Sequence, residues 1–211
     1  IYTAASKKGS NWNAHNNLGA VYIAMAIADN SKLADMTSKA AAQLEIAARM
    51  KETPEVHANL ASVSLMQGNP YKAASHASKA LNGASGDVSR GVNGVKGACE
   101  IYMAKYADAV RSESSALDTD VNLFNKGLAQ LLNKDFSNAS TSFAEAARKN
   151  SNMAIAHYGA AVAAARSGNA DGVAASLTSA VKIDPSLKDK ALTDLEFAAF
   201  STTDAFRNAL K

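Results

Sequence analysis

Residues 157–185 read HYGAAVAAARSGNADGVAASLTSAVKIDP, and this stretch predicts one helical hairpin. An alanine-rich segment runs to a turn at Gly168. The segment after the turn places Val173, Leu177 and Ala180 on one helix face, at positions i, i+4 and i+7, before the final Asp-Pro ends it. A single hairpin cannot bury its own apolar face, so we expect the unit to recur along the chain.

The unit does recur, at nearly regular intervals. The alanines that close successive copies are Ala47, Ala80, Ala116, Ala146 and Ala180. A period of roughly 34 residues is typical of stacked helical hairpins. We therefore predict a single array over residues 1–211, with repeats at 12–53, 54–87, 88–119, 120–151 and 152–186 and a C-terminal cap at 187–211.

Composition places the chain among folded, all-α proteins. Hydrophobic residues make up 47% and charged residues 19% of the 211, which is typical of a chain that can build a core. No apolar run approaches the roughly 18 residues of a membrane-spanning helix, so we expect no membrane insertion. The net charge of +3 comes from scattered side chains, which argues against a nucleic-acid partner. The lone Cys99 can form no internal disulfide and is expected to be a buried thiol.

The first repeat carries a specific resemblance. His15-x-x-Leu18-Gly19-x-x-Tyr22 is similar to the Trp-x-x-Leu-Gly-x-x-Tyr signature of the tetratricopeptide repeat (TPR) family, with His in the aromatic position. The resemblance implies a right-handed α-α superhelix of about five hairpins. It also implies that the first helix of each repeat lines a concave groove that holds a peptide or a partner's helix.

Three features depart from that pattern. The first repeat is about nine residues too long, so residues 29–38 should lengthen one helix or form a protruding loop. Glu113 occupies a position where a large apolar residue is expected, so it either extends to solvent or marks a local shift in register. The third feature is a run of glycines at every third position, Gly91, Gly94 and Gly97, whose spacing suggests a phosphate-binding loop. No Gly-Lys-Ser/Thr follows it, so these glycines instead predict a tight helix crossing or a weak point of the array.

No catalytic or metal site is predicted. His15, His57 and His157 occupy the same position of three repeats, and helices of neighbouring repeats lie about 10 Å apart. That distance is too long for one metal to be shared, so packing roles are expected, while His76 is isolated in the sequence. We expect no cofactor and no enzymatic activity. An enzyme would need a pocket that joins Glu113 or a histidine to another titratable group.

The exposed positions of the first helices are the candidate partner-binding residues that the resemblance implies. They are Asn13, Asn16, Asn17, Asn59, Ser62, Phe124, Asn125, Leu128, Tyr158 and Val162, with Ala20, Gly94 and Ala98 beside them. Asn17, Asn59 and Asn125 share one position, where an amide can hold both edges of an extended peptide. The alternative is that these asparagines pin neighbouring helices or face water.

The two ends carry further expectations. Residues 1–5 look like the tail of a helix whose start is missing, and residues 8–11 like a turn and cap, so contacts with missing N-terminal repeats are possible. At the other end, a stripe of small and apolar residues predicts a terminal helix on the last repeat, followed by a short helix capped near Thr203. The members of the stripe are Leu187, Ala191, Leu195 and Ala198.

The C-terminal end also bears on location and on an alternative role. It resembles the ends of tetratricopeptide proteins of Gram-negative cell envelopes, which implies a periplasmic or outer-membrane-associated chain, with a cytoplasmic one as the alternative. The expected function is a non-enzymatic scaffold that binds a protein or peptide partner. The alternative is a structural spacer that self-associates, in which Phe197, Phe200 and Phe206 form an oligomer contact.

Overall fold

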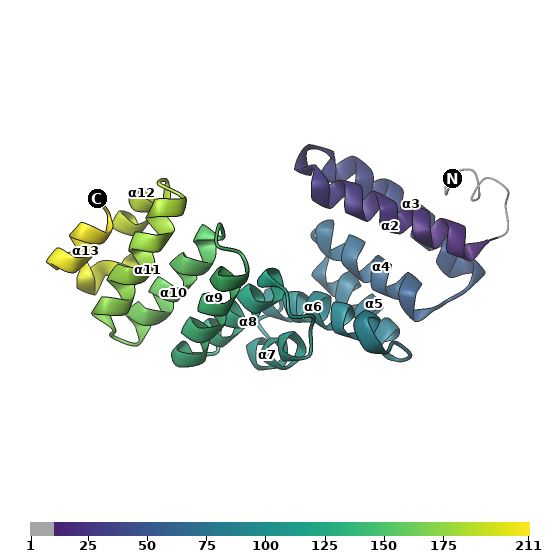
Figure 1. The fold of residues 1–211 in the computed structure, drawn as a ribbon. Helices are drawn as coiled ribbons and strands as arrows, with labels where there is room; N and C mark the ends of the chain where they lie inside the picture. The colour runs from purple at the N-terminus through teal and green to yellow at the C-terminus, as the bar shows by residue number, and fades with distance from the viewer. Residues whose placement is uncertain (1–10) are drawn as a thin grey trace. The chain divides into compact units, whose positions relative to one another are not determined.

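A computed structural model describes residues 11–211, which are helical with no strand among them. Figure 1 traces the helices along the chain. The described residues pack as two compact units, divided between Leu117 and Asp118, which are described separately below. The helix tail and turn expected at residues 1–10 lie outside the described residues. The all-α class is confirmed, whereas a single array over residues 1–211 stays a prediction.

The first unit consists of hairpins in which consecutive helices pack in pairs, α2 with α3, α4 with α5 and α6 with α7. Its elements are α2 (Trp12–Ala28), the 3-10 turn η1 (Asn30–Lys32), α3 (Leu33–Met50), α4 (Pro54–Met66), α5 (Pro70–Leu81), α6 (Gly86–Tyr102) and α7 (Tyr106–Ser114).

The second unit continues with two hairpins and three short terminal helices. Its elements are α8 (Asp120–Leu132), α9 (Phe136–Lys149), α10 (Ala154–Arg166), α11 (Ala170–Ile183), α12 (Leu187–Thr193), the 3-10 helix η2 (Leu195–Phe200) and α13 (Asp204–Ala209). Helix α8 packs on α9 and α10 on α11, while α13 covers α11.

The turns inside the hairpins follow from local sequence. Gly68 and Gly168 adopt φ of +74° and +75° at the ends of α4 and α10, a conformation that costs glycine nothing. The next residue, Asn69 or Asn169, caps the following helix, because its side chain accepts a hydrogen bond from the backbone N–H of the third residue of that helix. These glycine-asparagine pairs therefore set where each hairpin reverses.

The repeated small and apolar positions of the second helices form the core between hairpins. Thirteen of the positions that the period predicts are buried, at Ala40, Leu44, Ala47, Ala73, Ala77, Ala80, Ala109, Ala139, Phe143, Ala146, Val173, Leu177 and Ala180. Ala116 is different. Helix α7 ends at Ser114, so Ala116 lies outside the helix and is partly exposed.

This difference gives a matched pair of substitutions. Ala146→Leu is expected to lower the free energy of unfolding by about 1–3 kcal/mol, because it overpacks a closed helix crossing. Ala116→Leu should cost about 0.5 kcal/mol or less, since residue 116 is partly exposed and lies outside the helix crossing. Urea unfolding of both variants checks the prediction, and equal losses would contradict it.

The extra residues of the first repeat form no protruding loop. They lengthen both helices, so α2 spans 17 and α3 spans 18 residues, joined through the short turn η1. Asp29 caps that turn by accepting a hydrogen bond from the backbone N–H of Ser31 at 3.1 Å. The prediction that the extra residues lengthen a helix is therefore correct, but they are divided between α2 and α3 and do not lengthen one helix alone.

Glu113 neither extends to solvent nor marks a shift in register. It is 5% exposed and fills the position that a large apolar residue holds in other hairpins, against the backbone of Gly97. A Cβ at residue 97 would lie 2.6 Å from Glu113 Cγ, so the glycine is required there. The tight crossing predicted for the glycines of α6 is thus formed at Gly97. Gly91 has room beside it instead.

The C-terminal cap differs from the single terminal helix that the apolar stripe predicts. Helix α12 ends at Thr193, because Asp194 is extended (φ −77°, ψ 120°) and caps η2 by accepting a hydrogen bond from the Glu196 N–H. Leu195 is consequently 88% exposed, and only Leu187 and Ala191 of the stripe are buried. The short helix α13 begins as expected, with the Thr203 hydroxyl as its cap.

The phenylalanines of this end belong to the core of the second unit. Phe197 and Phe206 are buried with their ring centroids 5.9 Å apart, and Phe200 packs partly buried beside them. Buried rings cannot contact another molecule. The alternative in which Phe197 and Phe206 form an oligomer contact is therefore wrong.

Candidate protein-binding site

The first helices of neighbouring hairpins lie against one another within each unit. Helix α4 contacts both α2 and α6 in the first unit, and α8 contacts α10 in the second. Residues at equivalent positions of these helices therefore share a face, as the repeat period requires.

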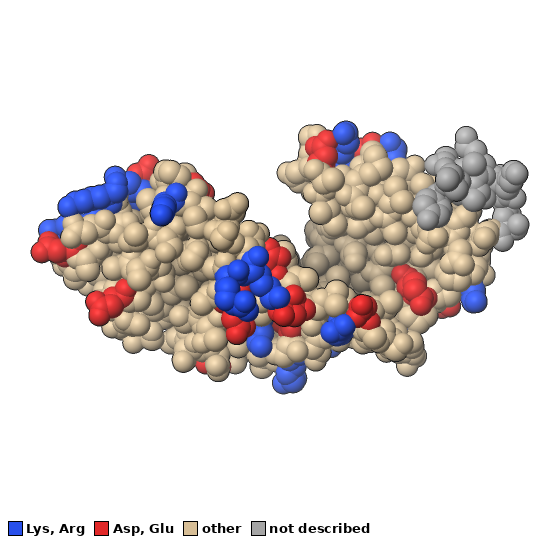
Figure 2. Space-filling view, in the orientation of Figure 1, with Lys and Arg blue, Asp and Glu red and all other residues tan. Residues whose placement is uncertain are grey.

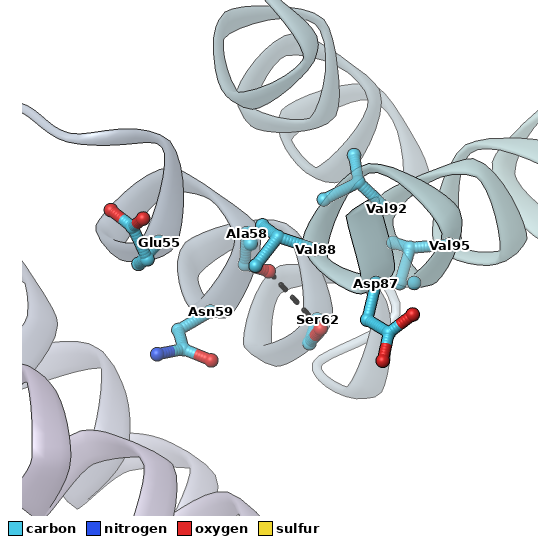
Figure 3. A pocket seen from close by; sticks show the side chains of 9 residues that line it. Glu55, Ala58, Asn59, Ser62, Asp87, Val88, Val92 and Val95 are labelled. Carbon is cyan, nitrogen blue, oxygen red and sulfur yellow. Dashed lines mark hydrogen bonds between the residues drawn. The ribbon is translucent and has the colours of Figure 1, made fainter. Parts of the chain in front are cut away.

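A hollow of about 380 Å³ opens between α4 and α6 in the first unit. Figure 3 shows it from close by. Both helices contribute side chains to it, and this set, called the α4–α6 hollow below, is Glu55, Ala58, Asn59, Ser62, Asp87, Val88, Gly91, Val92 and Val95.

The floor of the α4–α6 hollow is apolar and made of small side chains. Val92 is buried, and Ala58, Val88 and Val95 pack partly buried against the same cluster. The Ser62 hydroxyl donates a hydrogen bond to the Ala58 carbonyl at 3.1 Å, so it is already satisfied within α4. This floor therefore suits an apolar group and needs no polar partner.

The rim of the hollow carries negative charge. Glu55 and Asp87 lie on opposite sides of the apolar side chains, and no Lys or Arg lines the hollow. Asp87 forms an ion pair with Arg90 one turn along α6. Glu55 is the only charged residue in α2 and α4 taken together, although the chain as a whole is net positive. Figure 2 shows the surface over these two helices largely without charge.

Asn16 and Asn59 pin two helices together. The Asn59 side-chain amide donates a hydrogen bond to Asn16 Oδ1 at 3.0 Å, from α4 to α2, and Asn16 is buried. The alternative reading of the asparagines therefore holds for this pair, and Asn16 is not available to a partner. Asn59 remains half-buried at the edge of the hollow.

Tyr158 is buried beneath the C-terminal cap and does not line a groove. It is 4% exposed, and its hydroxyl donates a hydrogen bond to Asp194 Oδ2 at 2.7 Å. Its ring packs edge-on against Phe197, and the Lys190 ammonium lies 4.9 Å from its centroid. Burial, followed by the hydrogen bond to Asp194, raises the pKa of Tyr158 well above its usual range. A partner-contacting role for Tyr158 is therefore wrong.

The other predicted residues keep some exposure. In the first unit Asn13 is exposed, and Asn17 and Ala20 are half-buried on α2. In the second unit four partly buried residues lie on α8 and α10, and their binding role stays a prediction: Phe124, Asn125, Leu128 and Val162. The rings of Phe124 and Phe143 are 5.4 Å apart, so Phe124 also belongs to the core.

Sequence reasoning missed most of the α6 side of the hollow. The repeat pattern selected Gly94 and Ala98 on α6, but Gly94 is buried and the hollow is lined by Gly91 and Val95 instead. Helix α6 spans 17 residues against 13 for α4, with its additional length beginning at Gly86. The run Gly86-Asp87 was the available signal, since it starts this helix before the predicted repeat boundary.

His15 and His57 pack against the second helix of their own hairpins. His15 Nδ1 lies 2.8 Å from Gln43 Oε1, and His57 Nδ1 lies 3.2 Å from His76 Nδ1. His76 is therefore not isolated, although its partner is 19 residues away in sequence. Burial lowers the pKa of His57, His76 and His157.

Three further observations concern chemistry and membranes. Burial raises the pKa of the Cys99 thiol to about 11, so it stays protonated at neutral pH. Within residues 11–211, no three His, Cys, Asp or Glu side chains gather as a metal ion would require. None of the helices described is long and apolar enough to cross a membrane.

Comparison with known proteins identifies the fold. The sequence matches no protein-family model and no curated protein. Its structure is similar to that of YrrB, "a TPR protein with an unusual peptide-binding site", with a TM-score of 0.70 and 16% identity over 91% of this chain and 98% of that one.

Two further solved structures agree. MamA from Desulfovibrio magneticus RS-1 superposes with a TM-score of 0.65 and 14% identity, over 82% of this chain and 96% of that one. PilF of Pseudomonas aeruginosa gives 0.57 and 18%, over 92% and 97%. With its five helical hairpins in residues 12–183 and these neighbours, the chain has the tetratricopeptide-repeat fold that His15-x-x-Leu18-Gly19-x-x-Tyr22 predicted.

Proposed function

We propose that the chain is a non-enzymatic protein-interaction module that holds a partner segment in the α4–α6 hollow. The observation that carries the proposal is an apolar floor with a carboxylate rim, placed on the face that the first helices share. YrrB, which has the same fold, is described as binding a peptide. We also propose a periplasmic or outer-membrane-associated location, in keeping with the envelope proteins whose ends this C-terminus resembles.

The size of the hollow limits what it receives. Its volume of about 380 Å³ is at the lower end of the roughly 300–1,000 Å³ typical of ligand pockets. The floor is built from Ala58, Val88, Val92 and Val95, none of which offers a free donor or acceptor on its side chain. We therefore propose that one or two apolar side chains of an extended segment insert there.

The rim adds a preference for positive charge next to the apolar group. Glu55 is exposed, and a Lys or Arg of the partner can reach it without being desolvated, whereas the exposed Asp87 is already paired with Arg90. An exposed pair of this kind contributes only about 0.2–1 kcal/mol, so the rim orients the segment and the apolar floor supplies most of the affinity.

The proposal is tested by placing a larger side chain at Gly91, one of the residues that line the hollow. A Cβ at residue 91 meets only Leu117 Cδ1, at the ordinary contact distance of 3.8 Å, so a side chain can start from residue 91 without a clash. Gly91→Leu should occupy the hollow, whereas Gly91→Ala adds one methyl group. Both replace a helical glycine and should keep or raise stability, by about 0.5–1 kcal/mol for Ala.

The probe is a random peptide library, about 12 residues long, selected on the intact chain. Selected peptides should carry a large apolar residue beside a Lys or Arg, and Gly91→Leu should weaken their binding at least about tenfold, while Gly91→Ala leaves it within about threefold. Circular dichroism confirms that both variants are folded. Peptides that bind Gly91→Leu as tightly as the unaltered chain would overturn the proposal.

A further inference from the structure

His57 of α4 and His76 of α5 face each other through the same ring nitrogen. Their Nδ1 atoms are 3.2 Å apart, their ring centroids 5.3 Å, and their planes differ by 26°. The two centroids are farther apart than the two nitrogens by about twice the distance from a ring centre to a ring atom. The nitrogens therefore lie between the two ring centres, and the rings meet edge to edge and not face to face. This is the arrangement of an N–H···N hydrogen bond between two imidazoles.

Such a pair can bind one additional proton and keep its hydrogen bond, but it cannot keep the bond when it binds two. In the neutral pair, one ring donates from Nδ1–H and the other accepts at a bare Nδ1. The first added proton can go to the free Nε2 of the donor ring, and the hydrogen bond remains. A second added proton must go to the accepting Nδ1, where two N–H groups and two positive charges would then face each other across 3.2 Å.

The surroundings of the pair discourage the second proton further. His57 is 5% exposed and His76 is half-buried, so burial is the first cause that lowers the pKa of each. Lys79 of α5 lowers the pKa of both histidines and Lys72 lowers that of His76. Two nearby cations therefore add to the cost of charging the pair.

The acidic groups nearby offset this only in part. Glu52, just before α4, has its carboxylate 3.9 Å from His57 Nε2 and is 69% exposed, and Glu45 of α3 acts on His76 while it pairs with Lys72 at 3.5 Å. Both raise the respective pKa, but burial remains the larger effect. Helices α2 and α6, which also pack against this hairpin, contribute no charged group that shifts either pKa.

The first hairpin provides an internal comparison. His15 and His57 occupy the same position of their first helices, and Gln43 and His76 the same position of their second helices, three residues after Ala40 and Ala73. His15 is hydrogen-bonded to Gln43 at 2.8 Å. The same interhelical contact is thus made with one titratable partner in the first hairpin and with two in the second.

We infer that the His57–His76 pair is an acid-sensitive contact that holds α4 against α5 at neutral pH and forces them apart when both imidazoles are protonated. Helix α4 also carries Ala58, Asn59 and Ser62 of the α4–α6 hollow, so acid should weaken partner binding as well. That second consequence rests on the proposed function, whereas the loss of stability does not.

The sign of the effect follows from proton binding. The histidines of the unfolded chain take up protons near pH 6.5, and the lowered pKa values of the folded pair delay uptake to more acidic pH. Between the pKa of the unfolded histidines and the lower pKa values of the folded pair, the unfolded state binds more protons than the folded state. The free energy of unfolding therefore falls as pH falls below about 6.5. Above that pH the contribution of the pair is constant.

The experiment compares the full chain with His76→Gln, which installs in the second hairpin the residue found at this position of the first. Thermal unfolding is followed at about pH 7.5 and about pH 5, on either side of the ordinary histidine pKa. The unaltered chain should lose about 2–4 °C more in Tm on acidification than His76→Gln does, the scale expected for one lost interaction in a chain of this length. His15, His157 and the carboxylates are common to both proteins, so their contribution cancels.

Imidazole NMR titration gives a second readout that does not depend on the variant. In the unaltered chain His57 and His76 should titrate as a coupled pair, with one step well below pH 6.5, and in His76→Gln the His57 step should move to higher pH. Equal acid losses in Tm, or two independent titrations near pH 6.5, would overturn the inference. If the Tm difference appears but binding of the selected peptides is unchanged by acid, the histidine contact stands and its link to the α4–α6 hollow is refuted.

Discussion

Phe143→Ala is expected to lower the free energy of unfolding of the second unit by about 3–5 kcal/mol. Phe143 is 1% exposed and is among the largest fully buried side chains of the described residues. Its ring lies between α8 and α10, where a Cβ at Gly127 or Gly159 would come within 2.8 Å of it. Each of the two helices has a glycine where it faces this ring. When the ring is removed, neither glycine has a side chain that could fill the cavity.

Hydrogen exchange of peptides from residues 118–211 measures this loss, because it reports on the second unit without assuming that the whole chain unfolds in one step. Val121→Ala is the control on the same hairpin, since Val121 is 53% exposed and its truncation should cost about 0.5 kcal/mol or less. A loss below about 1 kcal/mol for Phe143→Ala would show that the glycine-lined space collapses around the smaller side chain.

Phe197→Ala should have a comparable effect, of about 3–5 kcal/mol, by detaching the C-terminal cap. The Phe197 ring meets Tyr158 edge-on at 5.6 Å and Phe206 at 5.9 Å, so its loss removes the centre of a three-ring cluster. The hydrogen bond from Tyr158 to Asp194 could not hold the cap in place by itself. Once the cap loosens, this bond is exposed to water, where its net contribution to stability is small.

The matched control is Leu195→Ala, two residues earlier in the same 3-10 helix. Leu195 is 88% exposed, so its truncation should change stability by no more than about 0.5 kcal/mol. Hydrogen exchange of residues 154–183 and size-exclusion chromatography check both variants together. A change of oligomeric state without loss of protection would contradict the assignment of Phe197 to the core.

The sequence by itself determined the repeating part of the molecule. The repeat period predicted thirteen of the buried small and apolar positions of the second helices, because an α-helix brings positions i, i+4 and i+7 to one face wherever it packs. It failed at Ala116, which lies beyond the end of α7. Gly68 and Gly168, each followed by asparagine, fixed hairpin reversals for an equally local reason. The apolar stripe at the C-terminus failed where Asp194 caps a new helix, since a local cap outweighed the periodic pattern.

Only the tertiary structure decided which side chains meet across helices. The period placed Asn16, Tyr158, His15 and His57 on first helices. It did not place them against their partners, which lie 19 to 43 residues away and are Asn59, Asp194, Gln43 and His76. Those meetings depend on how far each helix is rotated about its axis, and close contacts such as Glu113 on Gly97 set that rotation. The α4–α6 hollow has the same origin, because α6 begins at Gly86 and brings Asp87, Val88 and Gly91 opposite α4. Local propensity carries no information about such pairings, since the contact that selects them forms only when the hairpins stack.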